Sequence, residues 1–316
     1  MNKSFSFILP AYKAAFLKEA IDSILAQTYT NFELIIVNDA SPEDIDSIIN
    51  LYDDSRISYY INEKNIGGED LVAQWNHCIK YAKSDYIILA SDDDVYSPLY
   101  LEKMNNLVEK FPEVDVFRPR IKTIDANNNT IHIFGYLKEF VGMPEFIYHW
   151  MIGHIGSAIS YYLIKKEALF NHGGFISFPL AWGSDDATII SLSQNGIAFS
   201  SEILFSFRQS GKNISSKKNS VKVLKRKLMA YSKFFDWLQA FVSNINVPDV
   251  EEDKFYLNFI KSNLSSYYRS VTLDVLASSV PQAIILNVFL IRRLKAISVK
   301  DYLMTLYRCL VKHISK

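Results

Sequence analysis

The chain has 316 residues, of which 49% are hydrophobic, and its 34 basic side chains balance 34 acidic ones. A chain of this length and apolar content can bury a substantial core, and with zero formal net charge it has no overall charge to steer it toward nucleic acid. Two cysteines, Cys78 and Cys309, are too few for a disulfide framework. The sequence also begins without a signal-peptide pattern, so we expect a cytoplasmic location.

The first hundred residues alternate between strand and helix patterns. Short apolar runs predict strands at 5–10, 32–39 and 86–90. Between the first two strands, apolar residues at steps of three and four predict a crossover helix: Phe16, Leu17, Ala20, Ile21, Ile24 and Leu25. A strand, a crossover helix and a second strand form a parallel unit, and ligands of such sheets collect at the carboxyl ends of the strands.

Carboxylates stand at two of these strand ends. Asp39 ends the second strand, and Asp92, Asp93 and Asp94 follow the third. Three adjacent carboxylates repel one another strongly in a half-buried position, unless a cation lies among them. Oxygen ligands favour Mg²⁺ or Mn²⁺, which keep open positions for water and substrate phosphates. The alternative is a solvated acidic turn that caps the helix starting near Pro98, and the pattern alone fits both.

Several short segments follow one another in a fixed order: Ser6–Tyr12, Gln27–Thr28, Phe32–Ser41, Asn65–Gly67, Asn76, and Ser91–Asp94 with Pro98. In order and spacing they resemble glycosyltransferase family 2, whose members have the GT-A fold, and weaker matches continue to about residue 215. The resemblance implies an α/β protein with a Rossmann-like mixed sheet flanked by helices. Residues 1–215 would form this catalytic domain, and residues 216–316 a helical C-terminal region.

On the donor side, the resemblance implies a pocket for the nucleotide of a nucleotide-diphosphate sugar, with a UDP-sugar as the first choice. Pro10, Ala11 and Tyr12 would line this pocket, and Asp39 would accept a hydrogen bond from the nucleobase. The alternative for Asp39 is a simple turn formed with Asn38, because Asn and Asp bond their own backbone after a strand.

The resemblance also assigns the aspartate cluster. Asp92 would face the ribose, and Asp93 would bind Mn²⁺ or Mg²⁺ with Asp94 beside it. The commoner form of the motif has another aspartate where this chain has Ser91. Because three carboxylates stand in a row, the main metal ligand remains open between Asp93 and Asp94.

Two later segments complete the resemblance. Trp182-Gly-Ser-Asp-Asp186 falls where the family carries its catalytic base, which implies Asp186, or as second choice Asp185, as the base. An ordinary N-cap with an acidic first turn for a helix over 187–194 is the alternative. Phe207–Arg208 and Asn213–Ser215 match a Tyr-Arg-x-His-x-x-Asn-x-Ser segment, but Ser210 replaces the histidine. Arg208 thus becomes the candidate for binding the diphosphate.

The implied activity is an inverting, metal-dependent transfer of a hexosyl or N-acetylhexosaminyl group to a glycan or lipid-linked acceptor, in cell-surface polysaccharide biosynthesis. A metal would stabilise the charge on the leaving diphosphate, and a carboxylate would take the proton of the acceptor hydroxyl. Segments near 140–160 and 181–182 would shape the acceptor pocket. The alternative is a catalytically inactive nucleotide-sugar-binding or partner subunit on the same fold, which only Ser210 favours.

The C-terminal region begins with a run of basic residues between 217 and 227 that contains no acid. Helical patterns follow over 224–242, 251–277 and 282–296, and from Ser298, where Asp301 forms a capping-box-like pair. The longest uncharged stretch of this C-terminal region, 275–291, is shorter than the ~20 apolar residues that span a bilayer.

Beyond residue 291 a single acid, Asp301, faces a set of cations: Arg292, Arg293, Lys295, Lys300, Arg308 and Lys312. This balance suits peripheral docking on an anionic membrane, on the inner face of the plasma membrane. The alternative is that the helices pack on the catalytic domain and turn these charges to water.

Overall fold

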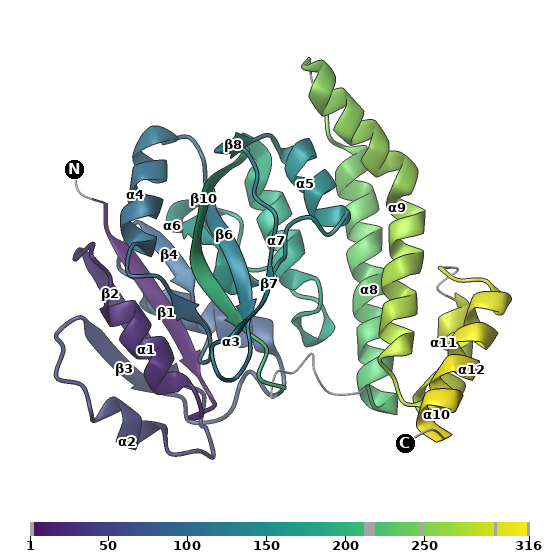
Figure 1. Ribbon diagram of the computed structural model, residues 1–316, viewed down its shortest axis with the longest axis horizontal. Helices are drawn as coiled ribbons and strands as arrows, with labels where there is room; N and C mark the ends of the chain where they lie inside the picture. The colour runs from purple at the N-terminus through teal and green to yellow at the C-terminus, as the bar shows by residue number, and fades with distance from the viewer. Residues whose placement is uncertain (1–2, 212–218, 247–248, 294–295, 315–316) are drawn as a thin grey trace. The chain divides into compact units, whose positions relative to one another are not determined.

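A computed structural model describes residues 3–211, 219–246, 249–293 and 296–314 of the chain. The chain divides into two compact units, Met1–Ser177 with Asp185–Ser210, and Phe178–Ser184 with Gly211–Lys316 (Figure 1). The boundary expected between residues 215 and 216 lies outside the described residues. Residues 178–184 belong to the second unit because Phe178 packs edge-on against Phe234, and Trp182 against Tyr231.

The first unit is built on one mixed sheet with the strand order β3-β2-β1-β4-β9-β6-β10-β5, with β7 paired to β6 and β8 to β10. Strands β1 to β4 run parallel, and β9 and β5 are antiparallel to their neighbours. The strands are β1 (Phe5–Ala11), β2 (Phe32–Asn38), β3 (Ile57–Ile61), β4 (Tyr86–Leu89), β5 (Val95–Tyr96), β6 (Val116–Ile124), β7 (Thr130–Ile133), β8 (Phe140–Val141), β9 (Leu163–Lys165) and β10 (Ile197–Arg208).

Helices flank this sheet, which confirms the predicted α/β architecture (Figure 1). The stripe predicted for the crossover helix is buried along α1, although Phe16 precedes the first turn. The helices are α1 (Leu17–Leu25), α2 (Ile45–Ile49), α3 (Leu71–Cys78), α4 (Tyr100–Lys110), α5 (Met143–Met151), α6 (Lys166–Asn171) and α7 (Ser184–Leu192), with short 3₁₀ turns η1 (Ile79–Tyr81), η2 (Ile159–Tyr161), η3 (Pro179–Ala181) and η4 (Ser193–Asn195).

The carboxyl ends of three strands meet at one edge of the sheet. Strand β1 lies between β2 and β4, and its register pairs Ala11 with Asn38 and Ile8 with Leu89. Asp39 and the aspartates that follow β4 therefore leave the sheet at the same edge as the end of β1. The strands themselves are buried on both faces, which fixes their register and the positions of the side chains that follow them.

The second unit is helical, as predicted. Its helices are α8 (Val221–Ser243), α9 (Glu251–Ala277), α10 (Pro281–Leu286), α11 (Val288–Arg293) and α12 (Val299–Ile314). Leu224 and Leu228 of α8, Leu276 of α9, Ile284 of α10 and Cys309 of α12 belong to one buried apolar cluster. Within the described residues, no helix is both long and apolar enough to cross a bilayer.

Two predictions for the end of the chain have different outcomes. The Ser298–Asp301 capping pair is confirmed, since each backbone N–H donates to the side chain of the other residue, at 3.0 and 3.1 Å. The prediction of a single helix over 282–296 is wrong, because the helix is interrupted at Asn287. The side-chain amide of Asn287 donates to the carbonyl oxygens of Val221, at 3.2 Å, and Ala283, at 2.8 Å. The hydrogen bond to Val221, at the start of α8, competes with a continuous helix.

Candidate active site

The buried Asp39 carboxylate organises the loop between β3 and α3. Its Oδ1 accepts hydrogen bonds from the side chain of Asn62 and the backbone N–H of Ile66, both at 2.8 Å, and its Oδ2 accepts one from Gly67 N–H at 2.7 Å. A Cβ at Gly67 would lie 2.9 Å from Oδ2, so this approach requires glycine. The turn after β2 is made instead by Asn38, whose Oδ1 accepts from Ser41 N–H at 2.9 Å. Oδ2 of Asp39 keeps capacity for one further donor.

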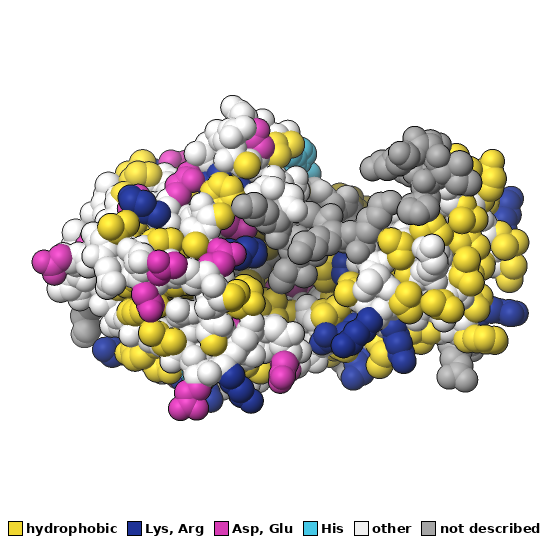
Figure 2. Space-filling model, turned by 90° about the horizontal axis from the view of Figure 1, so that it is seen from below, with side chains coloured by type: hydrophobic (Ala, Val, Ile, Leu, Met, Phe, Trp, Pro, Cys, Tyr) yellow, Lys and Arg dark blue, Asp and Glu magenta, His cyan; other side chains and the backbone are white. Residues whose placement is uncertain are grey.

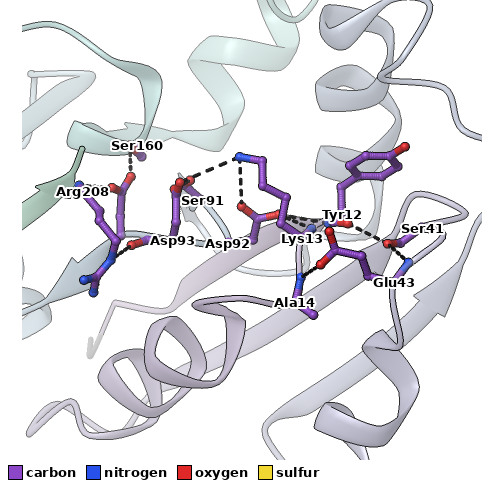
Figure 3. Close-up of polar contacts among 11 residues, drawn as sticks. Tyr12, Lys13, Ala14, Ser41, Glu43, Ser91, Asp92, Asp93, Ser160 and Arg208 are labelled. Carbon is purple, nitrogen blue, oxygen red and sulfur yellow. Dashed lines mark hydrogen bonds and ion pairs between the residues drawn. The ribbon is translucent and has the colours of Figure 1, made fainter. Parts of the chain in front are cut away.

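Asp92 ties the loop after β4 to the exit of β1. Its Oδ2 accepts hydrogen bonds from the backbone N–H groups of Tyr12, at 3.0 Å, and Lys13, at 2.8 Å (Figure 3). Burial raises the pKa of Asp92, and Lys13 partly offsets this effect. The structure thus brings Asp92 to the segment that was predicted to line the nucleotide pocket.

The ammonium group of Lys13 lies between two carboxylates of the cluster (Figure 3). Its Nζ is 4.0 Å from Oδ1 of Asp92 and 3.8 Å from Oδ2 of Asp93. Two carboxylate oxygens that lie on either side of one ammonium group are also suited to bind a divalent metal. Water and phosphate oxygens would fill the other coordination positions of that metal. Among the described residues, however, no three His, Cys, Asp or Glu side chains are arranged to hold a metal ion by themselves.

Asp94 is held by the protein on both carboxylate oxygens. Oδ1 accepts from Arg208 N–H at 2.9 Å, and Oδ2 accepts from the Ser160 hydroxyl at 3.1 Å. Burial raises the pKa of Asp94 well above its usual range, and the charge of Asp93 raises it further. The Asp93 carboxylate accepts from the hydroxyl of Ser91 and faces Lys13. Asp93 is 5% exposed and Asp94 is 1% exposed, so Asp93 is the more accessible candidate for a metal.

The fully buried Arg208 side chain supports the aspartate loop. Its Nε donates to the carbonyl oxygen of Asp93 at 2.7 Å, its Nη1 donates to Oδ1 of Asn128 at 2.7 Å, and its Nη2 lies 2.8 Å from a carboxylate oxygen of Glu19. This arrangement gives Arg208 a structural role beneath the cluster, and contact with a diphosphate stays a prediction. Residues 213–215 of the same motif lie outside the described residues.

The second carboxylate pair begins helix α7. Oδ1 of Asp186 accepts from the indole Nε1–H of Trp150 at 2.8 Å and from the Ser157 hydroxyl at 2.5 Å. Within the described part of the chain, no residue donates to Oδ2. Burial raises the pKa of Asp186, while the two hydrogen bonds lower it, and burial raises the pKa of Asp185 to about 8. Asp186 is thus a partly buried carboxylate with one oxygen oriented by the protein.

Several residues of this arrangement were not predicted, among them Lys13, Trp150 and Ser157. Lys13 directly follows the predicted pocket segment, and this position at a strand end, where the aspartate cluster was also expected, was the available signal. Trp150 and Ser157 lie within the 140–160 segment that was predicted to shape the acceptor pocket, but no motif marks them. Their link to Asp186 depends on tertiary contacts across 36 and 29 residues.

The chain is similar in sequence to known glycosyltransferases. The sequence model described as Glycosyl transferase family 2 matches residues 6–185, more than half of the chain. An uncharacterised glycosyltransferase of Rickettsia prowazekii is 41% identical over 173 residues, and one of Rickettsia typhi is 34% identical over 173 residues. Both alignments cover 52% of this chain and 53% of the relative, so the chain spans about half the length of these relatives.

Solved structures share the fold at low sequence identity. Staphylococcus aureus TarS 1–349, crystallised with UDP-GlcNAc, has a TM-score of 0.62 at 17% identity, covering 96% of this chain and 90% of that one. The mannosyltransferase PcManGT of Pyrobaculum calidifontis, in complex with GDP-Man and Mn²⁺, has a TM-score of 0.53 at 16% identity, covering 99% and 88%. The fold is therefore GT-A, as predicted, and the chain belongs to glycosyltransferase family 2.

Proposed function

We propose that this glycosyltransferase moves a sugar from a UDP-sugar to a glycan or lipid-linked acceptor with inversion, in cell-surface polysaccharide assembly. The observation that carries the proposal is the pairing of two carboxylate groups in one unit. The carboxylates of Asp92 and Asp93 lie on either side of the Lys13 ammonium group at the strand ends. In Asp186, Oδ1 is oriented by two hydrogen bonds, and no described residue donates to Oδ2. A metal-diphosphate site together with a base suffices for direct displacement.

The nucleotide would bind where β1 and β2 end. Pro10, Ala11 and Tyr12 line the exit of β1, and Asp39 lies at the end of the neighbouring strand with one acceptor position left for a nucleobase donor. TarS is crystallised with UDP-GlcNAc and PcManGT with GDP-Man, which supports a nucleotide sugar as the donor class. The choice of uridine remains our proposal.

Asp93 would be the main protein ligand of Mn²⁺ or Mg²⁺, with Asp92 beside it on the other side of the Lys13 ammonium. Both oxygens of Asp94 already accept hydrogen bonds from the protein, so Asp94 would stabilise the loop. When bound, the metal would supply positive charge to the leaving diphosphate. The Mn²⁺ found with PcManGT supports a divalent cation in this fold.

Asp186 would deprotonate the acceptor hydroxyl. Trp150 and Ser157 orient its Oδ1, which leaves Oδ2 to take the proton. Their hydrogen bonds favour the ionised form against the effect of burial, which a base requires. Direct displacement by the acceptor, assisted by one base, needs no second nucleophile and would invert the anomeric carbon.

The second unit would dock on an anionic membrane from the cytoplasmic side. Phe289 of α11 is 79% exposed and Tyr307 of α12 is 69% exposed, and Leu303 and Val299 continue the exposed stripe of α12. On the face drawn in Figure 2, hydrophobic and basic side chains gather over this unit. Apolar side chains among exposed cations are typical of interfacial helices.

Some of the cations behind this proposal are described and some are not. Arg292, Lys300 and Arg308 are exposed. The side chains of Arg293, Lys295 and Lys312 lie outside the described residues. Asp301, the one acid in this stretch, pairs with Arg269 of α9 at 2.6 Å, so its charge is compensated within the unit.

The metal assignment predicts that Asp93→Ala weakens Mn²⁺-dependent UDP binding by about 10- to 100-fold, because losing a contact to a charged group costs ~1.5–3 kcal/mol. Calorimetry of UDP binding with Mn²⁺ or with excess chelator measures this loss. The comparison variant is Asp94→Asn, which keeps an acceptor for the backbone N–H of Arg208 but loses the bond from Ser160, and which should weaken metal-dependent binding less than Asp93→Ala does. Unchanged affinity in chelator would contradict the assignment.

The base assignment predicts that Asp186→Asn lowers sugar transfer by roughly 10²–10⁴-fold while UDP affinity survives. Asparagine keeps an oxygen for Trp150 and Ser157 but cannot take a proton. Transfer is followed as UDP released from the UDP-sugar that binds. Asp185→Asn is the control: full loss there, with an active Asp186→Asn, would move the base by one residue. Donor binding with no turnover in the unaltered chain would favour the inactive-subunit alternative.

The membrane proposal predicts that the intact chain sediments with phosphatidylglycerol vesicles at low salt and is released at high salt, since each exposed cation contributes about 1 kcal/mol that salt screens. Replacing Phe289 and Tyr307 together by serine should weaken sedimentation. Phe255→Ser on α9, where the side chain is 59% exposed, is the matched control. Binding that is unaffected by both salt and the double substitution would show that this surface does not dock on lipid.

A further inference from the structure

One segment of the first unit reaches both carboxylate groups. We call residues 156–162 the bridging segment. Near its start, Ser157 donates its hydroxyl to Oδ1 of Asp186 at 2.5 Å. Three residues on, Ser160 donates its hydroxyl to Oδ2 of Asp94 at 3.1 Å. A shift of this segment would therefore disturb the proposed base and the aspartate cluster together.

Arg118 of β6 holds this segment at both ends. Its Nη1 donates to the carbonyl oxygen of Gly156 at 3.0 Å and to the phenolic oxygen of Tyr162 at 3.1 Å. The guanidinium carbon lies 5.1 Å from the ring centre of Tyr162 and 5.3 Å from that of Phe199, so aromatic faces enclose the charge. These contacts fix the first and last residues of the bridging segment to the central sheet.

The burial of Arg118 is costly for the fold. The side chain is 1% exposed, and arginine stays charged at any physiological pH. No carboxylate among the described residues forms an ion pair with it, and its buried Nε has no hydrogen-bond partner there. A buried charge without a counter-ion is destabilising, and an apolar side chain of similar size would cost less. Stability alone therefore does not account for Arg118.

We propose that Arg118 is a positioning residue, which clamps the bridging segment so that Ser157 and Ser160 hold Asp186 and Asp94 in their working geometry. The proposal rests on the function proposed above, in which Asp186 is the base. It adds that the side chain of Arg118, on β6, positions both Asp186 and the aspartate cluster through the bridging segment. Loss of the clamp should then change the base and the nucleotide site at once, although Arg118 touches neither.

The sign of the effect on the base follows from its hydrogen bonds. Burial raises the pKa of Asp186, and the bond from Ser157 lowers it. Without the clamp the Ser157 bond weakens, so the pKa of Asp186 should rise further. Among the described residues, the titratable groups that interact electrostatically with this carboxylate are Asp185 on its own helix and Tyr162, which lies between η2 and β9.

Trp150 offers a direct readout, because its indole N–H donates to Oδ1 of Asp186. In the ¹⁵N-tryptophan-labelled chain, the Trp150 indole resonance should titrate with the Asp185–Asp186 pair, and Trp150→Phe assigns it among the four tryptophans. Arg118→Met should raise the apparent midpoint of this titration by roughly half a pH unit to one pH unit. Tyr162→Phe, which removes one clamp bond but keeps the ring, should raise it in the same direction.

The second readout is UDP affinity in the presence of Mn²⁺, measured by calorimetry. Arg118→Met should weaken it by roughly three- to tenfold, about the effect of one lost hydrogen bond. Ser157→Ala should raise the midpoint without this loss of affinity, and Ser160→Ala should lower affinity without raising the midpoint. The matched control is Arg120→Met in the same strand. Arg120 donates to the carbonyl of Phe134 at 2.8 Å and has no bond to the bridging segment.

An unchanged midpoint and affinity in both Arg118→Met and Tyr162→Phe would overturn the clamp. Equal effects in Arg118→Met and Arg120→Met would also overturn it, because they would reflect a general loosening of β6. The midpoint needs neither donor nor turnover, so it tests the clamp by itself. If the unaltered chain bound no UDP, or if Asp186→Asn kept full transfer, the proposed function would fail while the midpoint still decided on the clamp.

Discussion

The site depends on one constraint: carboxylates that are removed from water at the ends of strands must be compensated by nearby donors and cations. Asp92 meets this need with two backbone N–H groups at the exit of β1, and Asp94 with the N–H of Arg208 at the end of β10. The two bonds to Asp92 join the aspartate loop to the end of β1, and the bond to Asp94 joins it to the end of β10. The cost of burying these charges is thus partly offset by contacts that also fix the loop. Lys13 supplies positive charge where a metal would bind.

The same logic links the two halves of the site. Arg208 donates a hydrogen bond to the backbone of the aspartate loop, and Arg118 donates one to the backbone of the segment that contacts both Asp94 and Asp186. Both arginines are buried on strands of the sheet, so the rigid part of the fold carries the charged groups, while loops present the carboxylates. A transferase needs its diphosphate site and its base at a fixed separation, because misplacement of reacting groups lowers the rate steeply.

Much of this arrangement could be predicted from the sequence, because local signals specify it. Apolar runs and a helical stripe predicted β1, α1 and β2, and the parallel order then brought Asp39 and the aspartate cluster to one edge. The roles of Ser157, Ser160 and Arg118 could not be predicted. Their contacts join residues 29, 66 and 44 positions apart, and no pattern of spacing encodes them. The break at Asn287 was missed for the same reason, since it depends on the carbonyl of Val221.

The most direct test of the account is a crystal structure of the chain with UDP and Mn²⁺, in which anomalous scattering locates the manganese. The account predicts one manganese ion between the carboxylate of Asp93 and the diphosphate, with Lys13 displaced from its place between Asp92 and Asp93 and the uracil against Asp39. Manganese bound elsewhere, or a diphosphate bound in this cluster without manganese, would contradict it.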